Sequence, residues 1–232
     1  MGKDVIVACD FDSAEKTFEF LDKFTEKKPF IKIGMELFFS ETPEIVREIK
    51  RRGHKIFLDL KLHDIPNTVK KAMAALSKLD IDMCNVHSAG TTEMMKAALE
   101  GLTREDGTRP ILIAVTQLTS TDQEAMERDL LIKEDMNKVV MHYAKTAENA
   151  GLDGVVCSPM EAEKVHEICG RDFLTVTPGI RFEDSVTDDQ KRIMTPAQAK
   201  KIGADYIVVG RPITTADDPV SAYEKCIREF VD

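Results

Sequence analysis

The chain has 232 residues and a mass of 26.0 kDa, a length that suits one domain with a substantial hydrophobic core. Apolar residues make up 43% and charged residues 31%, with 12 glycines and 9 prolines, which excludes collagen-like and low-complexity chains. The net charge of −9 argues against binding to nucleic acid or to an anionic membrane, because both need a basic surface. The chain has no apolar run of about 18 residues and no apolar stretch typical of a signal peptide, so we expect a cytoplasmic protein.

The five cysteines are widely spaced and never form a CxxC pair, so neither a disulfide framework nor a zinc site is expected. Cys9, Cys84 and Cys157 lie inside short apolar runs, where a thiol usually behaves as a small buried hydrophobic group.

Short β-branched runs alternate with amphipathic segments along the whole chain. The runs predicted as strands are VIVAC (5–9), PFIKIG (29–34), KIFLDLK (55–61), DMCNVH (82–87), PILIAVT (110–116), GVVC (154–157), FLTVTPG (173–179) and YIVVG (206–210). Segments 14–24, 43–53 and 196–204 carry apolar residues three and four apart, which is typical of helices. Glycines such as Gly53 and Gly203 precede the next strand, where a left-handed helix cap is expected.

Eight strand–helix units in 232 residues leave about 29 residues for each unit, close to the ~30 of a strand with its crossover helix. The pattern therefore predicts a single α/β domain over residues 1–232, a parallel (β/α)8 TIM barrel with outer helices. A doubly wound open sheet is the alternative. It needs a glycine-rich loop after the first strand, and ACDFDS (8–13) contains no glycine.

The segment DLKLHDIPNTV (59–69) is the strongest candidate for catalysis. Side chains two residues apart on a strand share a face, so Asp59 and Lys61 point the same way and the leucines around them point oppositely. The leucines suit the helix-facing side, which leaves both charges facing the mouth of the barrel, where such barrels carry their active sites. Lys32, between two isoleucines on the neighbouring strand, is expected to point inward as well.

Asp64, three residues after Lys61, extends this group to two lysines and two aspartates. The alternative interpretation is a structural ion-pair network at the end of the barrel, with Asp64 acting only as a helix cap. Burying a charged pair on a strand costs free energy, which favours a functional role for Asp59 and Lys61. Neighbouring carboxylates favour the ammonium form of Lys61, so a proton donor is favoured over an amine nucleophile.

Two glycine–arginine loops predict a phosphate site. Gly210 and Arg211 follow the eighth predicted strand, and Gly179 and Arg181 follow the seventh, the two loops where such barrels usually bind phosphate. Glycine lets main-chain N–H groups approach the oxygens, and arginine can bind two of them at once. The polar segment 182–192 is interpreted as a lid over the substrate or as a solvated connection.

The histidines do not suggest a metal site, because His54, His63, His87, His142 and His166 are scattered along the chain. His54 and His166 are interpreted as surface residues. His63 is interpreted as a possible support for Asp64, and His87 as either a site residue or a residue at the edge of the core. The sequence contains no GxSxG, HExxH or P-loop motif.

The chain resembles the orotidine 5′-monophosphate decarboxylases, which form UMP and CO2. The resemblance extends over nearly the whole chain and rests on ACDF (8–11), FIKIGMELF (30–38), FLDLKLHDIPNTV (57–69), NVHSAG (85–90), IAVTQLTS (113–120), GLDGVVCS (151–158), VTPGIR (176–181) and IVVGRPI (207–213). It implies that Lys61 protonates C6 of the pyrimidine, that Asp59 lies against the substrate carboxylate, and that Lys32 completes the network. No metal ion and no organic cofactor are implied.

The same resemblance implies a homodimer and a set of substrate contacts. Asp64, Ile65 and Thr68 would reach the partner subunit's site. Asp10 and Lys32 would hold the ribose hydroxyls, and Thr119 with Ser120 would contact the base. The remaining predicted contacts, mainly on the phosphate side, are Pro178, Arg181, Gln190, Gly210 and Arg211.

Two other functions remain open at this point. A magnesium-dependent sugar-phosphate enzyme of the same barrel type, such as a 3-keto-L-gulonate 6-phosphate decarboxylase or a hexulose-phosphate synthase, shares a DxKxxD strand. That function requires a divalent ion. A nucleotide-binding module without catalysis is the other, and would release no UMP.

Overall fold

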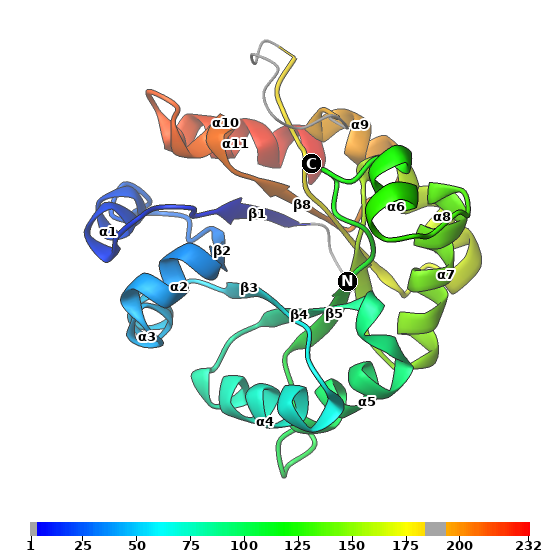
Figure 1. Ribbon diagram of the computed structural model, residues 1–232. Helices are drawn as coiled ribbons and strands as arrows, with labels where there is room; N and C mark the ends of the chain where they lie inside the picture. Colours follow the sequence, from blue (N-terminus) through cyan, green and yellow to red (C-terminus); the bar gives the residue numbers. More distant parts are fainter. Residues whose placement is uncertain (1–3, 184–193) are drawn as a thin grey trace.

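Eight parallel strands pair in chain order, and the last pairs with the first, so that the sheet closes into a barrel (Figure 1). The computed structural model describes residues 4–183 and 194–232. The strands are β1 (Asp4–Ala8), β2 (Phe30–Gly34), β3 (Ile56–Leu62), β4 (Met83–His87), β5 (Ile111–Val115), β6 (Gly154–Val156), β7 (Leu174–Thr177) and β8 (Tyr206–Val209). The predicted (β/α)8 barrel is confirmed, and the open doubly wound sheet is wrong because β1 and β8 are paired.

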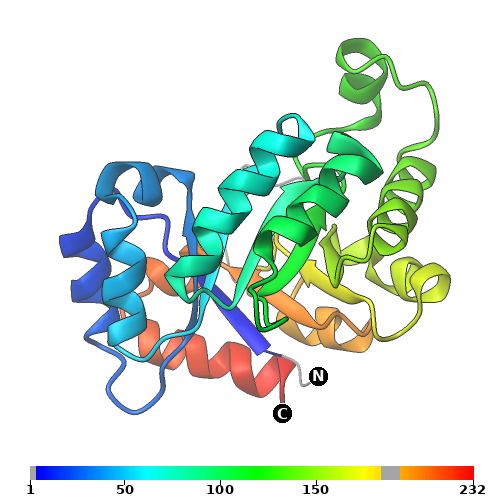
Figure 2. The same ribbon diagram turned by 90° about the horizontal axis from the view of Figure 1, so that it is seen from below.

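Helices surround the barrel, as the view turned by 90° also shows (Figure 2). The described α-helices are α1 (Ala14–Leu21), α2 (Met35–Glu41), α3 (Glu44–Arg51), α4 (Pro66–Leu76), α5 (Thr91–Leu102), α6 (Gln123–Asp129), α7 (Met136–Asn149), α8 (Ala162–Cys169), α9 (Pro196–Lys201), α10 (Arg211–Thr214) and α11 (Pro219–Phe230). Short 3-10 helices are η1 (Ser77–Leu79), η2 (Ser88–Gly90) and η3 (Pro159–Glu161). Gly53 and Gly203 have φ values of 87° and 80°, so the predicted left-handed caps are confirmed. None of these described helices has the length and apolar character needed to cross a membrane.

The alternation of side chains along the strands produces two apolar layers. One lies inside the barrel and includes Phe57 and Met83, while the larger one lies between strands and helices and includes Leu58 and Leu60. Cys9, Cys84 and Cys157 belong to the outer layer and are buried, as predicted. Burial raises the pKa of the Cys84 thiol to about 12, so this group remains protonated at neutral pH.

Two of the histidine predictions are wrong. His54 and His166 are 2% and 5% exposed and do not lie on the surface. A ring nitrogen of His54 lies 2.9 Å from the carbonyl oxygen of Pro29, and His166 Nε2 lies 3.1 Å from the hydroxyl of Thr175. His166 follows Ala162 by four residues on the buried face of α8, so helical spacing carried a signal for its burial.

Candidate active site

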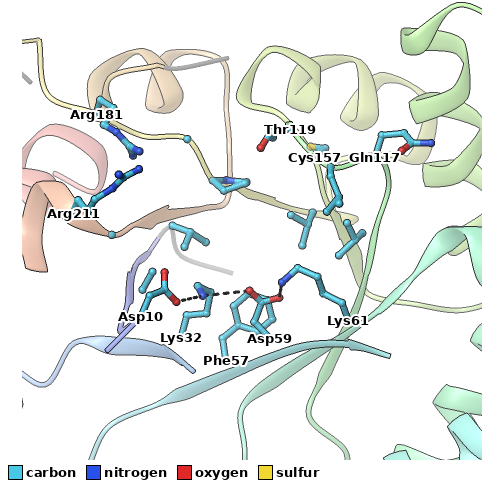
Figure 3. A pocket seen from close by; sticks show the side chains of 18 residues that line it. Asp10, Lys32, Phe57, Asp59, Lys61, Gln117, Thr119, Cys157, Arg181 and Arg211 are labelled. Carbon is cyan, nitrogen blue, oxygen red and sulfur yellow. Dashed lines mark hydrogen bonds and ion pairs between the residues drawn. The ribbon is translucent and has the colours of Figure 1, made fainter. Parts of the chain in front are cut away.

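A cavity of about 290 Å³ opens where the strands end at their carboxyl side (Figure 3). Ten residues predicted from the sequence line it: Asp10, Lys32, Asp59, Lys61, Thr119, Pro178, Gly179, Arg181, Gly210 and Arg211. The lining also includes Phe57, Gln117 and Leu118, which were not predicted as site residues. Residues from both halves of the chain therefore meet at one end of the barrel, as closure of the sheet requires.

A chain of alternating charges forms the floor of this cavity. Lys32 Nζ lies 2.9 Å from Asp10 Oδ1 and 3.4 Å from Asp59 Oδ2. Lys61 Nζ lies 2.7 Å from the other oxygen of Asp59. The order Asp10–Lys32–Asp59–Lys61 runs from the loop after β1 across β2 and β3, so the predicted inward direction of Lys32, Asp59 and Lys61 is confirmed.

The charges of the array stabilise one another despite their burial. Burial disfavours the charged form of Lys32, but the carboxylates of Asp59 and Asp10 outweigh it and raise the pKa of the Lys32 ammonium above its ordinary value. Burial likewise opposes the charge of Asp59, yet Lys32 and Lys61, with hydrogen bonds from Lys61 and Asn85, lower the pKa of this carboxyl. Asp59 is therefore ionised at neutral pH.

The end of β3 is irregular at the residues that carry the array. Between Leu58 and Leu62 the pairing with β4 shifts register, and Lys61 has a φ of 53°, in the left-handed region. A residue other than glycine in such a conformation stores roughly 1–3 kcal/mol of strain and is often found at a functional site. Simple alternation predicted the correct faces for Asp59 and Lys61 but not this bulge.

Asn85 on β4 is a buried member of the site that the sequence analysis missed. Its Nδ2 donates a hydrogen bond of 2.7 Å to Asp59 Oδ1, and its Oδ1 accepts one of 2.8 Å from the main-chain N–H of Lys61. A polar residue two positions from both Met83 and His87 shares their inward face, and this spacing was the available signal.

Two arginines lie on the opposite side of the cavity from the charge array. Figure 3 shows the side chains of Arg181 and Arg211 next to each other, above Asp10 and Lys32. Arg181 comes from the loop after β7, where Gly179, with a φ of 82°, permits the turn, and Arg211 is the first residue of α10, directly after β8 and Gly210. Two guanidinium groups side by side suit an anion with several oxygens, such as a phosphate.

Several predicted site residues do not line this cavity. Asp64, Ile65, Thr68 and Ser120 are exposed, and Asp64 Oδ1 accepts a hydrogen bond from the main-chain N–H of Ile65. Gln190 and most of the predicted lid at 182–192 lie outside the described residues.

His63 and His87 lie beside the site without lining the cavity. Their ring centroids are 5.9 Å apart. Burial, together with the nearby His63 and Lys61, lowers the pKa of His87 below its ordinary value, so its ring is neutral at pH 7. Within residues 4–183 and 194–232, no group of three or more histidine, cysteine, aspartate or glutamate side chains is arranged to hold a metal ion.

Comparison with known proteins identifies relatives over almost the full chain. The family model described as "Orotidine 5'-phosphate decarboxylase / HUMPS family" matches residues 3–226. The orotidine 5′-phosphate decarboxylase of Bacillus cytotoxicus is 53% identical over 227 residues, which are 97% of this chain and 95% of the relative. The enzyme of the same name from a Geobacillus species is 52% identical over 233 residues, covering 99% of this chain and 98% of the relative.

Solved structures show the same similarity. The crystal structure of orotidine 5′-phosphate decarboxylase from Lactobacillus acidophilus superposes with a TM-score of 0.89 at 43% identity, covering 99% of this chain and 100% of the other. An uncharacterized conserved protein from Geobacillus kaustophilus superposes with a TM-score of 0.88 at 46% identity, covering 97% of this chain and 99% of the other. The sequence and the structure agree, and the chain belongs to the orotidine 5′-phosphate decarboxylase / HUMPS family.

Proposed function

We propose that this protein decarboxylates orotidine 5′-monophosphate to UMP and CO2 in de novo pyrimidine biosynthesis, with Lys61 as the proton donor. The observation that carries the proposal is the position of Lys61 Nζ in the cavity, 2.7 Å from the ionised carboxylate of Asp59 and across from two arginines. The names of the relatives support the substrate, because they are about half identical to this chain over nearly its whole length.

The reaction needs a cationic group close to C6 of the pyrimidine ring. When the bond between C6 and the carboxylate breaks, the electron pair stays in an sp2 orbital of C6 that the ring π system cannot delocalise. An ammonium group held at C6 stabilises this charge and then transfers a proton to it, so that the CO2 leaves and UMP forms. The resulting amine of Lys61 regains its proton from water.

Asp59 holds the ammonium group of Lys61 and also acts on the substrate. Its carboxylate lies 2.7 Å from Lys61 Nζ, and we propose that the departing carboxylate of the substrate approaches Lys61 beside it. Two such charges 4 Å apart repel by ~4 kcal/mol at an effective dielectric constant of about 20, which disfavours the bound substrate relative to the transition state. We assign the larger part of the catalysis to stabilisation of the carbanion by Lys61.

The remaining cavity residues are proposed to bind the nucleotide. Arg181 and Arg211, with Gly210, would hold the phosphate, and Asp10 with Lys32 would hold the ribose hydroxyls. Contacts to the phosphate lie far from C6 and supply binding energy that orients the reacting ring. Thr119 and Ser120 belong to the loop after β5 and are proposed to contact the base, and Pro178 and Gln190 complete the predicted set.

A homodimer is part of the proposal. Asp64, Ile65 and Thr68 are exposed at the start of α4, where the large apolar side chain of Ile65 is 66% exposed. We propose that these side chains enter the partner subunit's site. The five free cysteines agree with a reducing compartment, so we propose that the dimer acts in the cytoplasm.

Replacing Lys61 tests the proposed chemistry. Lys61→Ala removes the proton donor, so turnover of orotidylate, followed by the loss of its absorbance, should fall by at least about 10⁴-fold while the protein remains folded. Lys138→Ala is the matched control, since the Lys138 side chain is 75% exposed on α7. Substantial remaining activity in Lys61→Ala would refute the role of this lysine.

A chelator separates this function from that of a magnesium-dependent sugar-phosphate enzyme. Turnover of orotidylate should be unchanged after dialysis against EDTA, because the charge array supplies the stabilising cation from lysine. Activity that is lost with EDTA and restored by Mg²⁺ would favour the metal-dependent alternative.

A further inference from the structure

Asn85 connects the two residues on which the proposed chemistry depends. It is 1% exposed and lies on β4 next to the end of β3. One carboxamide donates to Asp59 Oδ1 at 2.7 Å and accepts from the main-chain N–H of Lys61 at 2.8 Å. The same oxygen of Asp59 accepts the hydrogen bond from Lys61 Nζ, so the three residues form a closed ring of hydrogen bonds.

The bulge in β3 makes this connection necessary. Cys84 pairs with Leu58, whereas Val86, two residues later, pairs with Leu62. Asp59, Leu60 and Lys61 therefore all lie opposite Asn85, and Lys61 takes its positive φ within this segment. A strained segment keeps one conformation only if its surroundings impose it, and here the side chain of Asn85 provides the hydrogen bonds.

We propose that Asn85 is a positioning residue that holds the Lys61 main chain in its left-handed conformation and the Asp59 carboxylate in register, so that the ammonium group is aimed at the reacting carbon. This inference rests on the proposed decarboxylation. A carboxamide meets both demands at this position at any pH. A leucine of similar size forms neither hydrogen bond, and a carboxylate accepts from Lys61 but places a second negative charge beside Asp59.

The first test separates kcat from KM. Asn85→Leu should lower kcat for orotidylate by about 10²-fold, because a small misplacement of a catalytic group costs about that much. KM should change little, since the proposed ribose and phosphate contacts come from other strands. Thr177→Val is the matched control, a buried strand residue on β7 whose hydroxyl donates to a carbonyl away from the cavity. An unchanged kcat, whether or not KM rises, would overturn the proposal.

The second test uses pH. In Asn85→Asp the introduced carboxyl group, when protonated, donates to Asp59 as the amide does. The charged groups that face Asp59 are Lys32 and Lys61, with Asp10 behind Lys32, and the titratable ring of His87 lies nearby. All of these groups remain in the variant. The ratio of variant kcat to wild-type kcat should therefore rise as the pH falls. A ratio that is constant with pH would contradict a role that depends on donation to Asp59.

The third test does not depend on activity. In a crystal structure of Asn85→Leu, Lys61 should leave the left-handed region, and the contact of 2.7 Å between its Nζ and Asp59 Oδ1 should be lost. If both features persist, Asn85 does not position the pair. If the wild-type protein releases no UMP, the proposed function is wrong. The crystal structure of the variant would still decide whether Asn85 positions Lys61 and Asp59.

Discussion

Lys32 illustrates how this protein keeps a charge inside a barrel. Its ammonium group contacts Asp10 and Asp59. These carboxylates raise the pKa of Lys32, and Lys32 with Lys61 lowers the pKa of Asp59, so Lys32 and Asp59 both stay charged at neutral pH. A buried charge that loses its partner is costly, so these residues depend on one another for stability as well as for the proposed chemistry.

His54 provides a prediction at the residue scale. Burial lowers its pKa below the ordinary value of 6.5, so the folded protein binds a proton there less readily than the unfolded chain. The free energy of unfolding should therefore fall as the pH drops below 6.5 towards the pKa of the folded state, and level off below it. Asn can replace the hydrogen bond to the Pro29 carbonyl but does not titrate.

Denaturation in urea between pH 5 and 7.5 measures this effect. His54→Asn should show a weaker dependence of stability on pH than the wild type, and His142→Asn, at an exposed position on α7, is the matched control. Parallel pH curves for wild type and His54→Asn would show that His54 does not contribute.

At the scale of elements, three aspartates join neighbouring strands at the amino end of the barrel. Asp82, Asp153 and Asp205 each directly precede a strand and accept a hydrogen bond from the main-chain N–H of the strand before it, at 2.7, 2.7 and 2.8 Å. Arg109 also binds Asp153 through two nitrogens. These side chains align consecutive strands far from the cavity, which separates the contacts for stability from those for the proposed chemistry.

Asp153 allows this device to be tested. Asp153→Ala leaves the N–H of the buried Leu112 without the carboxylate and should lower the free energy of unfolding by about 1–3 kcal/mol. Asp153→Asn keeps an acceptor oxygen and should lose less. Urea denaturation gives the stabilities, with Asp217→Ala at an exposed position as the control. A fall in kcat at unchanged stability would contradict the separation of the two ends of the barrel.

The whole molecule carries a charge of −9, yet two arginines and two lysines line one cavity. An anionic substrate is thus attracted by a local arrangement of cations, which the overall charge does not reveal. The proposed dimer is also a property of the whole molecule, because each of its sites is complete only with Asp64 from the partner.

Mixing two inactive variants tests the shared site. If Asp64 acts in the partner's site, Lys61→Ala and Asp64→Ala should each be inactive alone. After unfolding and refolding together, equal amounts should recover about a quarter of the wild-type activity, because random pairing in a two-fold dimer makes half the dimers mixed, each with one intact site. No recovery in a mixture that sedimentation shows to be dimeric would place Asp64 outside the partner's site.

Most of the fold could be predicted from the sequence, because the spacing of apolar residues and the residues that end helices are local properties of the chain. The eight strands and the glycine caps at Gly53 and Gly203 follow from short apolar runs and from residues that permit positive φ. The inward direction of Asp59 and Lys61 follows from alternation along a single strand. The family resemblance also depends on linear motifs, and the comparisons confirm it.

Only the tertiary structure decided the features that depend on the contact between two secondary-structure elements, namely burial and strand register. The burial of His54 and His166 is set by what packs over them, and the bulge that places Asn85 opposite both Asp59 and Lys61 is a mismatch between two strands. The sequence of either strand does not predict this mismatch, because register is a property of the two paired strands. The sequence by itself determined which residues carry charge and which face of β3 they occupy, whereas the pairing of β1, β2 and β3 determined which charges of the array are neighbours.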